Sequence, residues 1–136
     1  DIFEEAGFKI VGMKMVWADE EILQEHYSEH VDKDFYERLE EYMSSGPIVA
    51  MVLEGVEAVK NTRKIVGETD PREADPSTIR GKFAHMSFEH ADGSGRLHKN
   101  IIHASAEKDE AEEEISIWFD DEELHDFESA HEEFVR

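Results

Sequence analysis

Positions 48 to 53 are all apolar, and that run leaves the chain few folds to adopt. Pro47 precedes the run and Glu54-Gly55 follows it. A short apolar run between turn-forming residues is typical of a buried central strand. Lys9 to Trp17 alternates instead, which predicts a second strand. One face of that strand would carry Val11, Met13, Met15 and Trp17.

Helical periodicity predicts most of the other elements. The segments with an apolar stripe at helical spacing are Glu20 to Glu29, Phe35 to Met43, Val56 to Val66 and Glu110 to Phe119. Asp1 to Ala6 is predicted as the end of another helix, stopped by Gly7, and Asp19 as an N-cap. Other expectations are a polar loop at Glu68 to Gly81, an irregular excursion at Phe83 to Lys99, a short strand at Asn100 to Ala104 and a short helix around Leu124. With 136 residues and no repeat or linker, residues 1–136 are predicted to form a single α/β (α+β) domain.

The charge balance excludes several classes of partner. Asp and Glu number 35 against 14 Lys and Arg, a formal net charge of −21. Such a surface repels nucleic acid and anionic lipid, so neither is expected as a partner. It is also typical of proteins from a high-salt cytoplasm, although an ordinary acidic protein explains it equally well. The chain has no cysteine, and no apolar run approaches the roughly 20 residues of a membrane helix.

The segment Asn100 to Ser105 is the richest in chemistry. It delivers His103 at the end of an apolar stretch, beside the small Ala104 and the hydroxyl of Ser105. Small neighbours let a phosphate approach an imidazole closely, and Glu114 on the next helix can hold the far ring nitrogen. By itself this pattern is weak, because a single histidine at a strand end is more often structural than catalytic.

Arg63, Thr69 and Arg80 form a second candidate site in a chain poor in cations. A guanidinium grips phosphate oxygens with two parallel hydrogen bonds, and a threonine hydroxyl adds another. The alternative is that both arginines pair with the abundant carboxylates on a solvated face. Phe35 offers a ring for stacking on a nucleobase, or simply belongs with Leu39 to the apolar stripe of its helix.

Histidines elsewhere in the chain raise the question of a metal site. His85, His90 and His98 lie with Asp92 in the excursion before His103, and His26 and His30 are spaced as on one helical face. Loose spacing in a glycine-containing loop favours solvated residues over ligands, and we expect the same of His26 and His30. No protein metal site is therefore predicted.

A series of motifs resembles the nucleoside diphosphate kinase family. In order they are Glu25-His26-Tyr27, Lys33-Asp34-Phe35-Tyr36, Ser45 to Val52, Gly67-Glu68-Thr69-Asp70-Pro71, Ser77-Thr78-Ile79-Arg80-Gly81, Asn100 to Ser105, and Glu114 to Phe119. The resemblance extends from the first residue to about Leu124. It implies a ferredoxin-like sandwich, with an antiparallel sheet and helices on one face. It also implies a homo-oligomer, hexameric or tetrameric. The absence of cysteine fits a reducing, cytoplasmic setting.

The resemblance further implies a ping-pong phosphotransferase. His103 would take the γ-phosphoryl group from a nucleoside triphosphate and pass it to a nucleoside diphosphate. The residues assigned by resemblance are Glu114 to orient His103, with Ser105 and Tyr27 beside it; Arg63, Thr69 and Arg80 on the phosphates; Phe35 and Leu39 at the base; and Asn100 on the sugar. Mg²⁺ would arrive bound to the nucleotide.

The sequence departs from the family pattern in three places. Family members begin with a strand ending in a Lys-Pro-Asp-Gly type motif whose lysine contacts the phosphates, and this sequence starts after it, as a fragment of a longer product would. The interval around 83–99 is longer than usual, as an insertion would make it, and Ala104 and Ala106 stand where Gly and Asp are common. The rival hypothesis is therefore an inactive nucleotide-binding or oligomeric module of the same fold, and a third is a metal-binding histidine loop.

Overall fold

The computed structural model describes residues 1–70, 73–83 and 101–128. The chain divides into two compact units, and each is described by itself. Unit 1 comprises Asp1–Gly55 with Glu112–Arg136, and unit 2 comprises Val56–Ala111. Among the described residues, no helix combines the length and the apolar character needed to cross a membrane.

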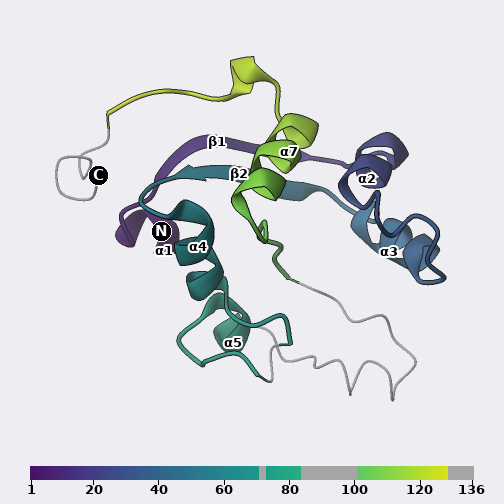
Figure 1. The fold of residues 1–136 in the computed structure, drawn as a ribbon, viewed down its shortest axis with the longest axis horizontal. Coiled ribbons are helices and arrows are strands. Elements are labelled where there is room, and N and C mark those ends of the chain that lie inside the picture. Colours follow the sequence, from purple (N-terminus) through teal and green to yellow (C-terminus); the bar gives the residue numbers. More distant parts are fainter. Residues whose placement is uncertain (71–72, 84–100, 129–136) are drawn as a thin grey trace. The chain divides into compact units, whose positions relative to one another are not determined.

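Unit 1 is built on a two-stranded antiparallel sheet (Figure 1). Strand β1 (Lys9–Val16) pairs with β2 (Ile48–Glu54), with Met13 opposite Met51, and the register shifts between Ile10 and Gly12. Both strands were predicted from the sequence, and the α+β class is confirmed. The prediction that β2 is buried on both faces is wrong. Its burial alternates, and Val49 is 48% exposed, because only one face of the strand packs on the rest of unit 1.

The alternation predicted for β1 places side chains on one face, and in unit 1 that face is largely exposed. Met13 is 62% exposed and Met15 70%, and Trp17 beyond the strand end is also exposed. Their partners on β2 at this face are Met51 and Val49. The opposite face packs on the last described part of the chain, since a Cβ added to Gly12 would fall 2.9 Å from a methyl carbon of Leu124 and 3.2 Å from the Phe119 ring.

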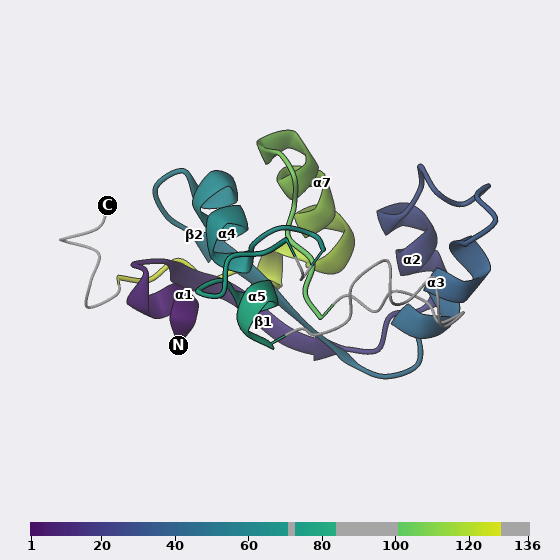
Figure 2. The ribbon, with the colours of Figure 1, turned by 90° about the horizontal axis from the view of Figure 1, so that it is seen from below.

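The described part of unit 1 contains several helices, and α2 has the side-chain cap predicted from the sequence. The helices are α1 (Ile2–Glu5), α2 (Glu20–His26), α3 (Tyr36–Met43) and the main part of α7 (Lys108–Trp118), and a 3₁₀ turn, η1, covers Asp121–Glu123. The Asp19 carboxylate accepts a hydrogen bond from the amide of Ile22 at 2.9 Å, which confirms it as the N-cap of α2. That helix ends three residues earlier than Glu29, since the Tyr27 backbone leaves the helical region. Figure 2 shows α2 and α3 as neighbours beyond the end of the sheet.

Two segments of the chain return to β1 from far along the sequence. Lys9 is only 3% exposed; its ammonium donates to the carbonyl of Phe127 and lies 3.9 Å from a Glu54 carboxylate oxygen. The Lys14 ammonium lies 2.8 Å from a carboxylate oxygen of Glu123. These contacts fasten η1 and the segment after it to the strand.

Unit 2 contains α4 (Ala58–Val66) and α5 (Ile79–Phe83). Helix α4 begins later than predicted because Glu57 adopts a left-handed backbone, with φ at 42°. It ends at Gly67, as predicted. The φ of Gly67 is 93°, a value that favours glycine. Helix α5 starts inside the segment that was predicted as a loop up to Gly81.

The short strand predicted at Asn100 to Ala104 is not formed at residues 101–104, and Asn100 lies outside the described residues. A strand requires a neighbour to share its ladder of hydrogen bonds. In unit 2 the carbonyls of Ile102 and Ala104 instead accept hydrogen bonds from arginine side chains. The helix predicted from Glu110 begins slightly earlier, at Lys108. Most of the Phe83 to Lys99 excursion, including His85, His90, Asp92 and His98, also lies outside the described residues.

Candidate active site

In unit 2 the segment carrying His103 is held by arginine side chains on both sides. Arg80 Nη2 donates to the carbonyl of Ile102 at 2.8 Å, and Arg63 Nη1 donates to the carbonyl of Ala104 at 3.0 Å. Ile102 and Ala104 are the residues immediately before and after His103, whose side chain is exposed. Two of the residues predicted to bind phosphate therefore lie beside the predicted nucleophile.

Arg80 is anchored far more deeply than a surface arginine. It is 5% exposed, and its Nη1 also donates to the carbonyl of Gly67 at 2.9 Å. Burial lowers the pKa of the Arg80 guanidinium, and the neighbouring positive charge of Arg63 lowers it further. Arg80 therefore does not lie on a solvated face, and the negative charge of Glu68 acts on its pKa in the opposite direction. Two guanidiniums kept close together form a place where an anion is electrostatically favoured.

Thr69 and Ser105, the other described residues predicted in unit 2, lie on different segments. Thr69 is exposed in the turn after α4, and Ser105 is half-buried just before α7. The start of α7 is held by the Glu110 carboxylate, which accepts from the amide of Ala106 at 3.2 Å. The Asn100 prediction is not addressed by the described residues.

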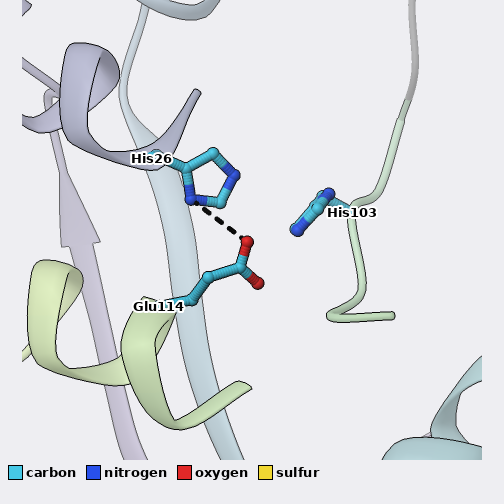
Figure 3. Close-up of side chains that lie close together, drawn as sticks. All are labelled: His26, His103 and Glu114. Atoms are coloured by element: carbon cyan, nitrogen blue, oxygen red, sulfur yellow. Dashed lines mark ion pairs between the residues drawn. The ribbon is translucent and has the colours of Figure 1, made fainter. Parts of the chain in front are cut away.

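In unit 1 the structure brings Glu114 and Tyr27 to one place. Glu114 lies on α7 with its side chain 12% exposed, and one carboxylate oxygen is 3.5 Å from Nδ1 of His26 (Figure 3). Tyr27 packs edge-on against the His26 ring, with 4.5 Å between centroids. Burial raises the pKa of the Tyr27 phenol, and the negative charge of Glu114 raises it further. At neutral pH Tyr27 is therefore a hydrogen-bond donor and not a phenolate.

The two residues predicted at the base, Phe35 and Leu39, are also in unit 1. Phe35 caps the start of α3 and is 45% exposed, and its ring lies 5.7 Å from that of His30. Leu39 is half-buried one helical turn further along. An exposed aromatic ring at a helix start is available to stack on a planar ligand, whereas a core residue is not.

His26 is the residue whose environment the sequence interpretation missed. It was expected to be solvated, but its side chain is 5% exposed. Its Nδ1 accepts a hydrogen bond from Nε1 of Trp118 at 2.9 Å. His30 was also expected to be solvated, and its Nδ1 is buried without a hydrogen-bond partner among the described residues. The signal was the position of His26 on the apolar stripe of α2, beside Ile22 and Leu23.

Comparison with known proteins gives a consistent result over most of the chain. The family model described as "Nucleoside diphosphate kinase" matches residues 1–124. A nucleoside diphosphate kinase from Pyrococcus abyssi is 45% identical over 134 residues, which cover 98% of this chain and 80% of the relative.

Solved structures agree with that match. A nucleoside-diphosphate kinase from Borrelia burgdorferi, solved as a transition-state mimic with bound vanadate and ADP, superposes with a TM-score of 0.88 at 37% identity. That likeness covers 96% of this chain and 81% of the other. A halophilic nucleoside diphosphate kinase from Halobacterium salinarum in complex with CDP gives a TM-score of 0.85 at 39% identity, covering 99% of this chain and 84% of the other. The ferredoxin-like fold predicted from the sequence is thereby confirmed.

Proposed function

The chain belongs to the nucleoside diphosphate kinase family, and from that premise we propose that it moves a γ-phosphoryl group between nucleotides through a phosphohistidine on His103. The observation that carries the proposal is the placement of Arg63 and Arg80 on either side of His103 in unit 2. A nucleophile flanked by two cations is suited to a phosphate, since phosphoryl transfer depends mainly on positioning and on neutralising charge.

In the first half-reaction an imidazole nitrogen of His103 attacks the γ-phosphorus in line with the bond to the β-phosphate oxygen. The P–N bond forms as that P–O bond breaks, and the nucleoside diphosphate leaves with the bonding electron pair. In the second half-reaction a terminal oxygen of another nucleoside diphosphate attacks the phosphorus, and the P–N bond breaks. The two halves together are an exchange with no net hydrolysis.

The other proposed roles divide between electrostatics and orientation. Arg63, Arg80 and Thr69 bind the phosphate oxygens, and Glu114 accepts the N–H of the far His103 nitrogen, so that the attacking nitrogen keeps its lone pair. Further proposed contacts are Ser105 and Tyr27 beside the histidine, Phe35 and Leu39 at the base, and Asn100 at the sugar. The vanadate and ADP in the Borrelia burgdorferi relative support a phosphoryl-transfer site in this fold.

We propose that Mg²⁺ enters on the nucleotide. In unit 2 the segment around His103 contacts the guanidiniums of Arg63 and Arg80 through its main-chain carbonyls. That donor set fits the phosphate part of a magnesium nucleotide, whose metal keeps water and phosphate ligands, better than it fits a carboxylate cage. When bound, Mg²⁺ would neutralise part of the phosphate charge, and Arg63 and Arg80 would neutralise a further part.

The setting we propose is a homo-oligomer, a hexamer or a tetramer, in the cytoplasm of a halophilic organism. The exposed apolar residues Met13, Met15 and Trp17 support self-association. The net charge of −21 and the likeness to the halophilic Halobacterium salinarum enzyme support the high-salt setting. Light scattering, and melting temperatures across a potassium chloride series, test both points.

Phosphate trapping tests the function directly. The chain is incubated with γ-labelled ATP and magnesium at low and high salt, and the label is located by peptide mapping. An acid-labile label on His103 that adding a nucleoside diphosphate discharges supports the proposal. The His103→Ala variant should take no label while still binding ADP. His125→Ala, which removes another exposed histidine, should label normally.

A negative labelling result has two explanations, and a longer version of the chain distinguishes them. A folded chain that binds ADP but takes no label at either salt concentration contradicts the proposal as it applies to this chain. Adding a family-like first strand with its lysine then distinguishes an enzyme that needs that segment from an inactive binding module. A rise in melting temperature on adding zinc or nickel would instead favour the metal-binding hypothesis.

A further inference from the structure

His26 has a protonation state that its neighbours determine. Its Nδ1 lies 2.9 Å from the indole Nε1 of Trp118 and 3.5 Å from a carboxylate oxygen of Glu114. An indole N–H can only donate, so Nδ1 must be the bare, accepting nitrogen. The proton of the neutral ring is therefore on Nε2. The 3.5 Å separation from Glu114 is longer than the roughly 2.7–2.9 Å of a charge-assisted hydrogen bond.

This arrangement decides what Glu114 is available to do. A protonated His26 would carry an N–H on Nδ1, which would displace the indole proton and pair with the nearby carboxylate of Glu114. A neutral His26 with a bare Nδ1 cannot donate to Glu114 from that nitrogen. The hydrogen bond from Trp118 therefore opposes the state in which His26 captures the carboxylate.

We propose that His26 and Trp118 are positioning residues, which keep His26 neutral and thereby leave the Glu114 carboxylate to serve the nucleophile. The proposal rests on the proposed function for the role of Glu114 toward His103, but its geometry lies wholly within unit 1. Glu114 and Trp118 are both on α7, one helical turn apart, and His26 is the last residue of α2. The packing of α2 against α7 thus carries the effect.

The charged and titratable groups around His26 come from several elements. Glu114 faces it from α7, and Tyr27 packs against it from the end of α2. The Tyr27 ring lies near the His30 ring, with 6.4 Å between the two centroids. Tyr42 on α3 contributes to the raised pKa of the Tyr27 phenol. Of these groups, Glu114 has the charge at neutral pH that favours protonation of His26. The hydrogen bond from the Trp118 indole and the burial of the ring oppose that protonation.

The first experiment reads the tautomer without any assay of activity. Nitrogen-15 NMR of the full chain distinguishes a protonated ring nitrogen from a bare one. We expect His26 to show a bare Nδ1 and a protonated Nε2 at neutral pH. A protonated Nδ1 in the parent chain would overturn the proposal, whether or not the chain transfers phosphate.

The second experiment removes the indole donor. In Trp118→Phe the neutral form of His26 loses its hydrogen bond, so its titration should move up by about one pH unit. The acid limb of the kcat/KM profile for transfer should move up with it. Trp17→Phe is the matched control, because it also deletes an indole hydrogen bond, to the carbonyl of Ser44 at 2.6 Å, away from His26. It should leave the acid limb in place.

A double variant separates positioning from mere packing. Adding His26→Asn to Trp118→Phe removes the titrating ring, so the raised acid limb should disappear even if the rate stays lower. Two results contradict the proposal. One is an acid limb that stays raised in the double variant. The other is an unchanged acid limb in a Trp118→Phe variant that circular dichroism shows to be folded. If Trp118→Phe does not fold, the NMR result on the parent chain still decides. If the parent takes no phosphate label while the His26 titration moves as expected, the proposed function has failed and the His26–Trp118 arrangement stands.

Discussion

Replacing Arg80 by lysine should destabilise unit 2 and displace the segment that carries His103. The Arg80 guanidinium bonds the carbonyls of Gly67 and Ile102 at 2.9 and 2.8 Å while it is 5% exposed. Lysine keeps the positive charge but has a single nitrogen and no planar fork, so it cannot reproduce both bonds at once.

The size of the effect follows from these contacts. A hydrogen bond to a charged group is worth about 1.5–3 kcal/mol, so the two bonds together set a ceiling of about 3–6 kcal/mol. A hydrogen bond from the lysine ammonium to one of the two carbonyls, and entry of water, offset part of that loss. We expect the free energy of unfolding to fall by about 2–3 kcal/mol, a large part of the roughly 5–15 kcal/mol that stabilises a domain.

Urea unfolding followed by far-UV circular dichroism measures this change without nucleotide. With a slope of about 1–3 kcal/mol per molar urea, the midpoint should move down by about 1–2 M. Transfer measured as kcat/KM should fall by about 30- to 150-fold if the His103 segment is displaced by a comparable free energy. Arg38→Lys on the exposed side of α3 is the control, with an expected change within about 0.5 kcal/mol.

Parent-like unfolding in Arg80→Lys would refute the structural reasoning, because it would mean that the two carbonyl bonds contribute nothing net. Parent-like unfolding with weaker ADP binding would leave Arg80 as a phosphate ligand alone. Lower stability with unchanged transfer would separate the His103 segment from the arginine that holds it. Each pattern therefore assigns Arg80 to one task.

Three further substitutions test other features of the fold. Gly67→Ala should lower the free energy of unfolding by about 2–4 kcal/mol. The φ of Gly67 is 93°, and the new Cβ would fall 2.4 Å from Oγ1 of Thr78. Thermal melting measures the loss of stability. Burial raises the pKa of Tyr36 from 10.0 to about 12, so the parent should lose stability as pH rises through that interval, and Tyr36→Phe should lose less in urea titrations at each pH. The hydrogen bond from the amide of Asp120 lowers the pKa of the Glu123 carboxyl below its ordinary value of 4.5. The ionised carboxylate therefore stabilises the fold above pH 4.5, and this contribution is lost as the pH falls through the lowered pKa. The stability difference between the parent and Glu123→Gln should shrink accordingly in acid.

Local chemistry was enough to predict most elements of secondary structure. Asp19 caps α2 because its carboxylate reaches an amide three residues on, and Gly67 ends α4 because its backbone adopts a positive φ. The strand Lys9–Val16 follows from alternation along one segment. Such signals act between residues close in sequence, so the chain need not be folded for them to be visible.

The candidate site was recognisable from motifs, but its architecture was not. The order of the motifs around Tyr27, Thr69, Arg80 and His103 indicated the family, which the comparisons confirm. Nothing local indicated that Arg80 would bond the carbonyl of Ile102, 22 positions away in sequence. That bond depends on a tertiary contact between α5 and residues 101–104, which are not neighbours in sequence.

Sequence by itself determined the approximate places of both strands and most helices and the family to which the chain belongs. The tertiary structure decided that residues 101–104 bond to arginines instead of forming a strand, that Met13 and Met15 lie exposed, and that His26 is buried against Trp118 and Glu114. The physical reason is the distance along the sequence over which each property is determined. Caps, turns and periodicity depend on residues close together in the sequence. Burial and the choice of hydrogen-bond partner depend on residues that only folding brings together.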